Sequence, residues 1–268
     1  MPRTPTLILI LTLSTTTRAA DHAPAPEFDR IVIDDNFPGA YQVEIADING
    51  DKKLDIIALG GSTVAWYENP TWKKRIITNK STTPGVISSA SRDLDGDGRA
   101  EIAIAYDFEM NQPHRGELLL ASQGETPDDP WTTKHLGHFP SIHRLRWGDF
   151  DNDGLPDLII APIFGENAKP PTYDQDPATL LCLRTTQPIK KAQEWKFDRM
   201  PLMKCPVMHA IDVVEPISRE PFGPLPAAKS QVLSASNLGV GAVFHDPEMA
   251  VGDEAPLIPV TIFPGAQG

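Results

Sequence analysis

One acidic pattern of nine residues occurs three times in this chain. The copies begin at Asp47, Asp93 and Asp149, so they lie 46 and 56 residues apart. In each copy, residues with side-chain oxygen atoms occupy positions 1, 3, 5 and 9, and Gly or Asn stands where the loop must turn. A repeat of this length is typical of propellers and solenoids. The pattern therefore indicates a repeat architecture.

The chemistry of the pattern is that of a calcium loop. Ca²⁺ binds about six to eight oxygen ligands, and alternate residues of a tight loop can direct their oxygen atoms to one centre. Position 7 would contribute a backbone carbonyl, which any residue can supply. The expected ligands are Asp47, Asn49, Asp51, Lys53 and Asp55; Asp93, Asp95, Asp97, Arg99 and Glu101; and Asp149, Asp151, Asp153, Leu155 and Asp157. The alternative is a set of solvated acidic turns without metal.

The first loop departs from the other two. Asn49 replaces an acidic residue at position 3, and Lys52 stands where the other loops have Gly98 and Gly154. Lys is less suited than Gly to a positive φ. We therefore expect two to three bound Ca²⁺ ions, with the first loop the weakest site.

Short stretches of strand character surround every acidic loop. One stretch precedes the loop, an apolar run typical of a strand buried on both faces follows it, and a Trp stands before the last stretch. The predicted strands are 41–45, 56–59, 64–67 and 76–77; 86–90, 102–105, 118–120 and 135–136; and 143–147, 158–161, 180–183 and one starting near 197. Four meandering strands per repeat predict a β-propeller blade, with the acidic loop between its first two strands.

The predicted fold is all-β, a propeller of four-stranded antiparallel blades over residues 28–268. We expect blades over about 28–72, 73–131 and 132–197, a degenerate blade without an acidic loop over 198–250, and a partial unit over 251–268. Closed propellers typically have about four to eight blades. Either four degenerate blades close the ring, or the chain is part of a longer protein, which the incomplete last unit favours.

The three loops resemble the FG-GAP or VCBS repeat, the calcium-bearing blade motif of integrin α-chain-type propellers and many secreted bacterial proteins. The resemblance covers about residues 40–200 and weakens after them. It implies a propeller, one Ca²⁺ per intact loop, and a binding or scaffold role. It implies no particular ligand, because propellers carry unrelated functions.

Charge and the N-terminal sequence indicate where such a chain would act. The net charge of −12 argues against a nucleic-acid partner. Residues 1–20 have the pattern of a signal peptide, with Arg3, an apolar run over 7–13 and small residues at the end. The alternative is a buried N-terminal strand. The run is too short to span a bilayer, so we expect an exported, periplasmic or secreted protein without a transmembrane segment.

His143 and His209 are candidates for a second metal site. Each lies on the strand that would line the channel of its blade, and two imidazoles can bind Zn²⁺ or another transition metal. The arrangement is similar to the propeller of aldos-2-ulose dehydratase-like proteins, which implies a metal-dependent sugar dehydratase or lyase. A catalytic zinc usually takes three protein ligands. The alternative is two histidines of the core or rim.

The sequence favours a binding or scaffold module for carbohydrate or an extracellular protein over an enzyme, and it assigns no catalytic residue. The proline-rich excursion over 169–177 is expected to contact a partner, because long loops on a rigid scaffold often carry function. Trp72, Trp131 and Trp195 recur at one blade position, which predicts packing between blades. Cys182 and Cys205 either form a disulfide or remain buried thiols.

Overall fold

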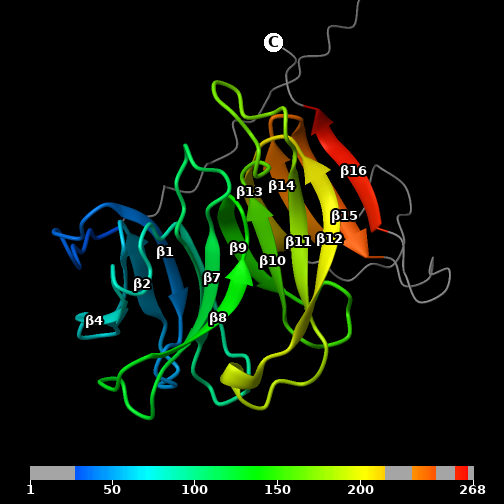
Figure 1. Cartoon of the computed structure of the whole chain (residues 1–268). Helices are drawn as coiled ribbons and strands as arrows, with labels where there is room; N and C mark the ends of the chain where they lie inside the picture. Colours follow the sequence, from blue (N-terminus) through cyan, green and yellow to red (C-terminus); the bar gives the residue numbers. More distant parts are fainter. Residues whose placement is uncertain (1–27, 215–230, 246–256, 265–268) are drawn as a thin grey trace, which may run out of the picture. The chain divides into compact units, whose positions relative to one another are not determined.

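The computed structural model describes residues 28–214, 231–245 and 257–264. The chain divides into two units, residues 1–35 and 36–268. Residues 28–35, the described part of the first unit, form no helix or strand. The strands all lie in the second unit (Figure 1). The predicted signal peptide over residues 1–20 lies outside the described residues.

The second unit is a β-propeller of four-stranded antiparallel blades, as the sequence predicts (Figure 1). It has four blades, and the strands of each sheet follow chain order. The described residues otherwise contain one short 3₁₀ helix, η1 (Ala192–Glu194). Blade 1 contains β1 (Ala40–Ala46), β2 (Asp55–Gly60), β3 (Thr63–Glu68) and β4 (Lys73–Thr78). Blade 2 contains β5 (Ser88–Arg92), β6 (Glu101–Tyr106), β7 (Glu117–Ser122) and β8 (Thr132–His138). Blade 3 contains β9 (Ile142–Gly148), β10 (Asp157–Pro162), β11 (Ala178–Thr185) and β12 (Phe197–Cys205). Blade 4 contains β13 (Met208–Val214), β14 (Gln231–Ser236), β15 (Gly239–His245) and β16 (Leu257–Pro264).

The apolar runs form the central strands because each run is buried on both of its faces. Successive residues of a strand point to opposite faces of the sheet. In β6, Ile102 and Ile104 pack against blade 1, whereas Ala103 and Ala105 pack against blade 3. In β10, Leu158 and Ile160 face blade 2, and Ile159 and Ala161 face blade 4. The core therefore consists of three apolar layers, one between each pair of successive blades.

The first strands of the blades lie side by side, β1 next to β5, β5 next to β9, and β9 next to β13. One face of β1 turns toward β5, where Glu44 accepts hydrogen bonds from Ser89 and Ser91. The other face of β1 is exposed, with Val43 at 71% and Ile45 at 63% of their full exposure. These first strands hold the side chains discussed below.

The sheets begin and end at other residues than the predicted blade boundaries. The boundary expected after residue 72 falls inside blade 1, because β4 completes that sheet. β8 and β12 likewise belong to blades 2 and 3, and β16 is the fourth strand of blade 4 in the segment expected to start another unit. The recurring Trp thus precedes the last strand of its blade and does not mark the blade boundary. Trp195 is buried in the apolar layer between blades 2 and 3.

Cys182 in β11 and Cys205 in β12 are buried free thiols, and burial raises the pKa of each thiol above its usual value. Among the described residues, no helix has the length and apolar character that a membrane span requires.

The layer between blades 1 and 2 can be tested by truncating Ile104, which is fully buried there. Ile104→Ala should lower the free energy of unfolding by about 2–5 kcal/mol, because it leaves a cavity in a packed layer. The control Val43→Ala, on the exposed face of β1, should change it by less than about 0.5 kcal/mol. Denaturant unfolding of the full chain measures both, and equal effects would contradict the layered core.

Candidate functional site

The three acidic loops connect β1 to β2, β5 to β6 and β9 to β10, and their hydrogen bonds follow one scheme. The carboxylate at position 1 accepts the backbone N–H of position 6 in every loop, as Asp93 does from Gly98 at 2.9 Å. The carboxylate at position 5 accepts the N–H of position 7, as Asp97 does from Arg99 at 2.8 Å. These bonds curl each loop around its own carboxylates.

Two positions of every loop have a positive φ, which is the left-handed region that favours Gly. Position 4 is Gly50, Gly96 or Asn152, with φ values of 79°, 80° and 63°. Position 6 has φ values of 66° at Lys52, 87° at Gly98 and 88° at Gly154. Lys52 therefore takes the same backbone conformation as the glycines of the other loops, at a steric cost that they do not have.

The carboxylate at position 9 closes each loop from inside the fold. Asp55, Glu101 and Asp157 are the first residues of the central strands, and all three are buried. Each accepts the backbone N–H of position 2, at 3.0–3.1 Å. The residues at position 2 are Ile48, Leu94 and Phe150, which are themselves buried in the core.

Two position-9 carboxylates also tie the acidic loop to the turn between the third and fourth strands of the blade. Asp55 accepts the N–H of Asn69, and Asp157 accepts that of Thr185, each at 2.8 Å. Because a buried donor without an acceptor is costly, these carboxylates stabilise the blade irrespective of any metal.

The second and third loops bring carboxylates together as a cation site requires. Oxygen atoms of Asp93, Asp95 and Glu101 lie within 4.8 Å of one another, and so do those of Asp149, Asp151 and Asp153. One oxygen in each group, Asp95 Oδ1 and Asp149 Oδ1, is buried without a hydrogen-bond partner. A buried polar atom without a partner is rare in folded proteins, so both groups fit a bound cation.

The first loop is arranged differently. Its residues form no such carboxylate group within the described part of the chain. The Lys53 ammonium lies 2.9 Å from an Asp51 oxygen, and the amide of Asn49 donates to Glu68. A side-chain cation thus already pairs with one of the expected ligands, and a second ligand side chain is turned toward β3.

Crowding of carboxylates inside the fold favours their protonated forms. Burial is the main cause that raises the pKa of Glu101 to about 8, and the neighbouring charges of Asp95, Asp97 and Asp93 act in the same direction. Burial, with the charges of Asp151 and Asp153, raises the pKa of Asp157 to about 7. Burial also raises the pKa of Asp151. A bound cation would remove this penalty on the ionised groups.

Tyr41, His143 and His209 meet near the opposite end of the first strands. The imidazole centres of His143 and His209 are 5.0 Å apart, and the Tyr41 hydroxyl lies 3.4 Å from His143 Nε2. His209 is exposed, whereas His143 is only 3% exposed and contacts Phe108. Burial, and to a smaller extent the charges of Arg144 and His209, lower the pKa of His143 to about 3, so the ring is neutral at pH 7. Its Nδ1 atom is buried without a hydrogen-bond partner.

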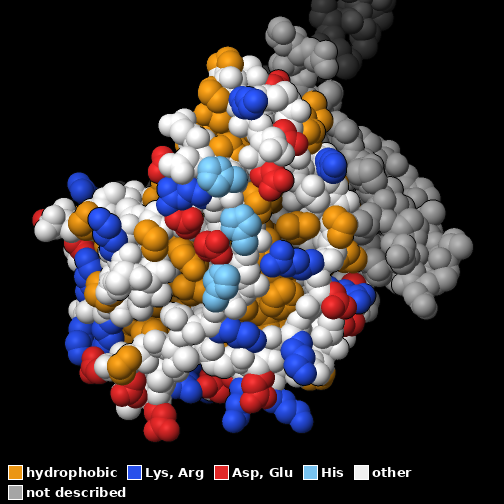
Figure 2. All heavy atoms as spheres, viewed as in Figure 1, with side chains coloured by type: hydrophobic (Ala, Val, Ile, Leu, Met, Phe, Trp, Pro, Cys, Tyr) orange, Lys and Arg blue, Asp and Glu red, His pale blue; other side chains and the backbone are white. Residues whose placement is uncertain are grey.

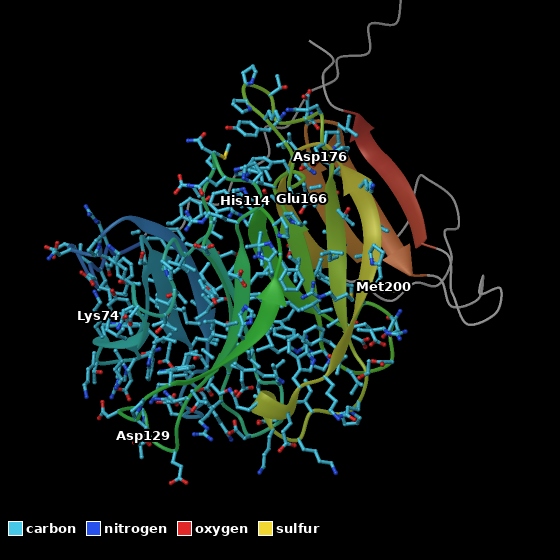
Figure 3. All side chains as sticks on the ribbon, in the orientation of Figure 1. Lys74, His114, Asp129, Glu166, Asp176 and Met200 are labelled. Carbon is cyan, nitrogen blue, oxygen red and sulfur yellow. The ribbon has the colours of Figure 1, made fainter. Side chains whose placement is uncertain are left out.

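The proline-rich excursion lies at this same end, where Figure 3 labels His114 and Glu166, whereas Asp129 lies at the other end. Tyr173 stacks on Phe164 at 4.7 Å between ring centres and donates its hydroxyl to Asn111 of the loop after β6. Phe108 packs into the same cluster and also contacts His143. The excursion is thus joined through Phe108 to the histidine pair.

One cluster of polar side chains was not predicted from the sequence. Glu117 of β7 accepts a hydrogen bond from His135 at 2.7 Å and another from His138 at 2.9 Å. Figure 2 shows histidines with acidic side chains beside them on this face. The two histidines are three positions apart, so an undistorted strand would place them on opposite faces. A register shift opposite Leu118 and Leu119, with Gly137 at a φ of 137°, turns both to one face.

Four antiparallel four-stranded sheets, the first three with an acidic loop between their first two strands, define a β-propeller protein. A model of the FG-GAP-like repeat matches residues 47–104 and again residues 93–160, and each match contains two of the acidic loops. Residues 47–160 are therefore similar to FG-GAP-like repeats, within the span of about 40–200 for which the sequence predicts this resemblance. The search of curated proteins found no match.

The structural role of the position-9 carboxylate can be tested at Asp157. Asp157→Ala leaves the buried N–H groups of Phe150 and Thr185 without acceptors, at about 1–3 kcal/mol each. The free energy of unfolding should therefore fall by about 2–6 kcal/mol, whereas Asp157→Asn keeps one acceptor oxygen and should lose less. Denaturant unfolding in the presence of a chelator measures the effect of these hydrogen bonds alone, because the chelator removes any bound metal. An Asp157→Ala chain as stable as the wild type would contradict it.

Proposed function

We propose that the chain is an exported, calcium-stabilised β-propeller that acts as a binding module for carbohydrate or an extracellular protein. The observation that carries the calcium part is the pair of unpartnered buried oxygens, Asp95 Oδ1 and Asp149 Oδ1, each within a carboxylate cluster. Ca²⁺ prefers carboxylate and carbonyl oxygens, and the second and third loops offer both.

The role of the metal would be to stabilise the loops that join the first two strands of blades 2 and 3. Ca²⁺ would supply positive charge where three carboxylates converge and where burial already opposes their ionisation. An ion that binds the folded loops and not the unfolded chain stabilises the fold by mass action. In the first loop, the Lys53–Asp51 ion pair makes the same site weaker.

The binding role rests on what the propeller presents away from these loops. The first strands of blades 1, 2 and 3 border a hollow of about 620 Å³, which is within the usual size range of small-molecule sites. The proline-rich excursion over 169–177 packs near the end of these strands, because Tyr173 stacks on Phe164 and Phe108 lies in the same cluster. A rigid sheet scaffold with a long loop at one end is a common arrangement for recognition.

A second candidate function is a metal-dependent sugar dehydratase or lyase. It is favoured by the approach of His143 to His209 and by the unpartnered Nδ1 atom of His143, since neutral imidazole is a common metal ligand. Two imidazoles fall short of the three protein ligands usual for catalytic zinc. Within the described residues, no group of three possible metal ligands includes either ring.

Calcium should raise the melting temperature of the chelator-treated protein. At a Ca²⁺ concentration of about 100 times the dissociation constant, one site contributes about 2.7 kcal/mol. The variant carrying Asp95→Ala and Asp151→Ala should lose most of the calcium-dependent increase. The matched control carries Glu125→Ala and Asp198→Ala, which remove two exposed carboxylates outside the loops, and should retain it. Calorimetry of all three proteins measures this, and a wild-type melting temperature that ignores Ca²⁺ would exclude the proposed role.

Elemental analysis of the desalted protein separates the two candidate functions. A calcium-stabilised binding module should contain calcium alone. A metal-dependent lyase should contain calcium and about one equivalent of zinc or another transition metal, which His143→Ala should remove because it deletes one of the two ligands. A transition metal retained by His143→Ala would exclude the histidine pair as its site.

A further inference from the structure

The hollow beside the first strands is positively charged, although the chain as a whole carries a net charge of −12. Arg92 at the end of β5, together with Arg144 and Arg146 of β9, lines it. Other polar or aromatic residues of the lining are Tyr41, Gln42, Glu44, Ser91 and Trp147. Three guanidinium groups that line one hollow repel one another, so their gathering on a strongly acidic protein indicates an anionic ligand.

Among the described carboxylates, only Asp212 forms an ion pair with any of these arginines. The Arg92 side chain has no hydrogen bond or ion pair with any described residue. Arg144 donates to the backbone oxygen of His143 and to the Tyr41 hydroxyl, and it stands over the Tyr41 ring at 5.3 Å. Arg146 donates to the backbone oxygen of Leu145, and its nearest carboxylate oxygen, on Asp212, is 3.6 Å away with both side chains exposed. An exposed pair at this distance contributes little.

Glu44 is the only acidic residue in the lining of this hollow, and its carboxylate is already engaged. Both of its oxygens accept hydrogen bonds, one from the Ser89 hydroxyl and the other from the backbone and hydroxyl of Ser91. Burial raises its pKa, against the lowering effect of these hydrogen bonds and of Arg146. The charge that faces a ligand is therefore that of the three arginines.

We propose that this hollow binds an anionic oligosaccharide, with Arg92, Arg144 and Arg146 pairing with its carboxylate or sulfate groups. The proposal rests on the proposed binding function and names the class of its ligand. Arg is suited to planar, bidentate recognition of oxyanions. Tyr41, 51% exposed, lies among the arginines, where its hydroxyl can bond a sugar hydroxyl and its ring offers an aromatic face.

A saccharide suits the lining better than an acidic peptide. Protein partners usually anchor through large side chains that enter desolvated pockets. The apolar members at the β1 side of this hollow, Val43 and Ile45, are exposed and form no such pocket. Its volume of about 620 Å³ suits a few sugar units.

The test is calorimetric titration of the full chain with four probes, namely tetragalacturonate, a sulfated tetrasaccharide, neutral maltotetraose and tetraglutamate. Free Ca²⁺ is removed by desalting beforehand, because uronates bind it themselves. At least one anionic saccharide should bind, more weakly as ionic strength rises, and maltotetraose should not. The two anionic saccharides distinguish carboxylate from sulfate recognition.

Substitutions in the hollow identify the site. Arg144→Gln and Arg146→Gln should each weaken binding about tenfold or more, because each removes a charge-assisted contact. Arg92→Gln, on β5, should weaken binding of the anionic saccharide as well. The control carrying Lys80→Gln and Lys191→Gln removes two exposed positive charges elsewhere and should bind as the wild type does. Equal melting temperatures verify that every variant is folded.

The proposal is overturned if no anionic saccharide binds at low ionic strength, if maltotetraose binds equally well, or if the arginine substitutions leave binding unchanged. Tighter binding of tetraglutamate would overturn the assignment to a saccharide. The effect of Ca²⁺ on the melting temperature of the same samples tests the proposed function separately from the saccharide site. If calcium stabilises the chain and no anionic saccharide binds, this inference alone fails. If Ca²⁺ does not change the melting temperature, the proposed stabilisation of the propeller by calcium is wrong.

Discussion

The buried carboxylate at the start of each central strand is the constraint on which the first three blades depend. Asp55, Glu101 and Asp157 each accept the N–H of the residue after position 1 and so anchor the loop next to the core. A buried carboxylate is unfavourable unless it is hydrogen-bonded or paired. In all three loops it accepts the backbone N–H of position 2, so the apolar residue there can stay inside; Asp55 and Asp157 accept a second backbone N–H as well. The loop, the strand and the apolar layer thus stabilise one another.

Opposite charges are separated within the same blades. Eleven of the 36 acidic residues lie in the three loops, whereas three arginines line the hollow beside the first strands. Charges of one sign in a partly enclosed space raise the local concentration of ligands of the other sign. Bound cations at the loops would reduce the overall repulsion of an anionic ligand without changing the hollow itself. The stabilising and recognising parts of the protein can therefore differ in charge while they share strands.

Much of the fold was predictable because it depends on patterns among residues close together in the sequence. The apolar runs, the alternating stretches before them and the repeated loops predict the strands of blades 1 to 3 to within a few residues, and the approach of His143 to His209 follows from their equivalent positions. The arginine hollow was not predictable, since Arg92, Arg144 and Arg146 come from two blades and have no motif. The pairing of His135 and His138 with Glu117 depends on a register shift that periodicity does not reveal. Properties that arise between strands, rather than along one, were the ones missed.

The side chain at position 7 distinguishes the three loops in their expected affinity for Ca²⁺. From the sequence, only the backbone oxygen of this residue was expected to take part in binding. Lys53 and Arg99 each turn back and pair with the position-5 carboxylate of their own loop, so a tethered cation takes part of the place that a metal would fill. Leu155 has no charge to offer, and Asp153 remains in the carboxylate group of the third loop. In the second loop, the position-9 carboxylate of Glu101 is the third member of the carboxylate group. The first loop has no such group among the described residues. Since a tethered ammonium or guanidinium competes with a free ion for the same oxygens, we infer that affinity for Ca²⁺ decreases from the third loop to the second and then to the first.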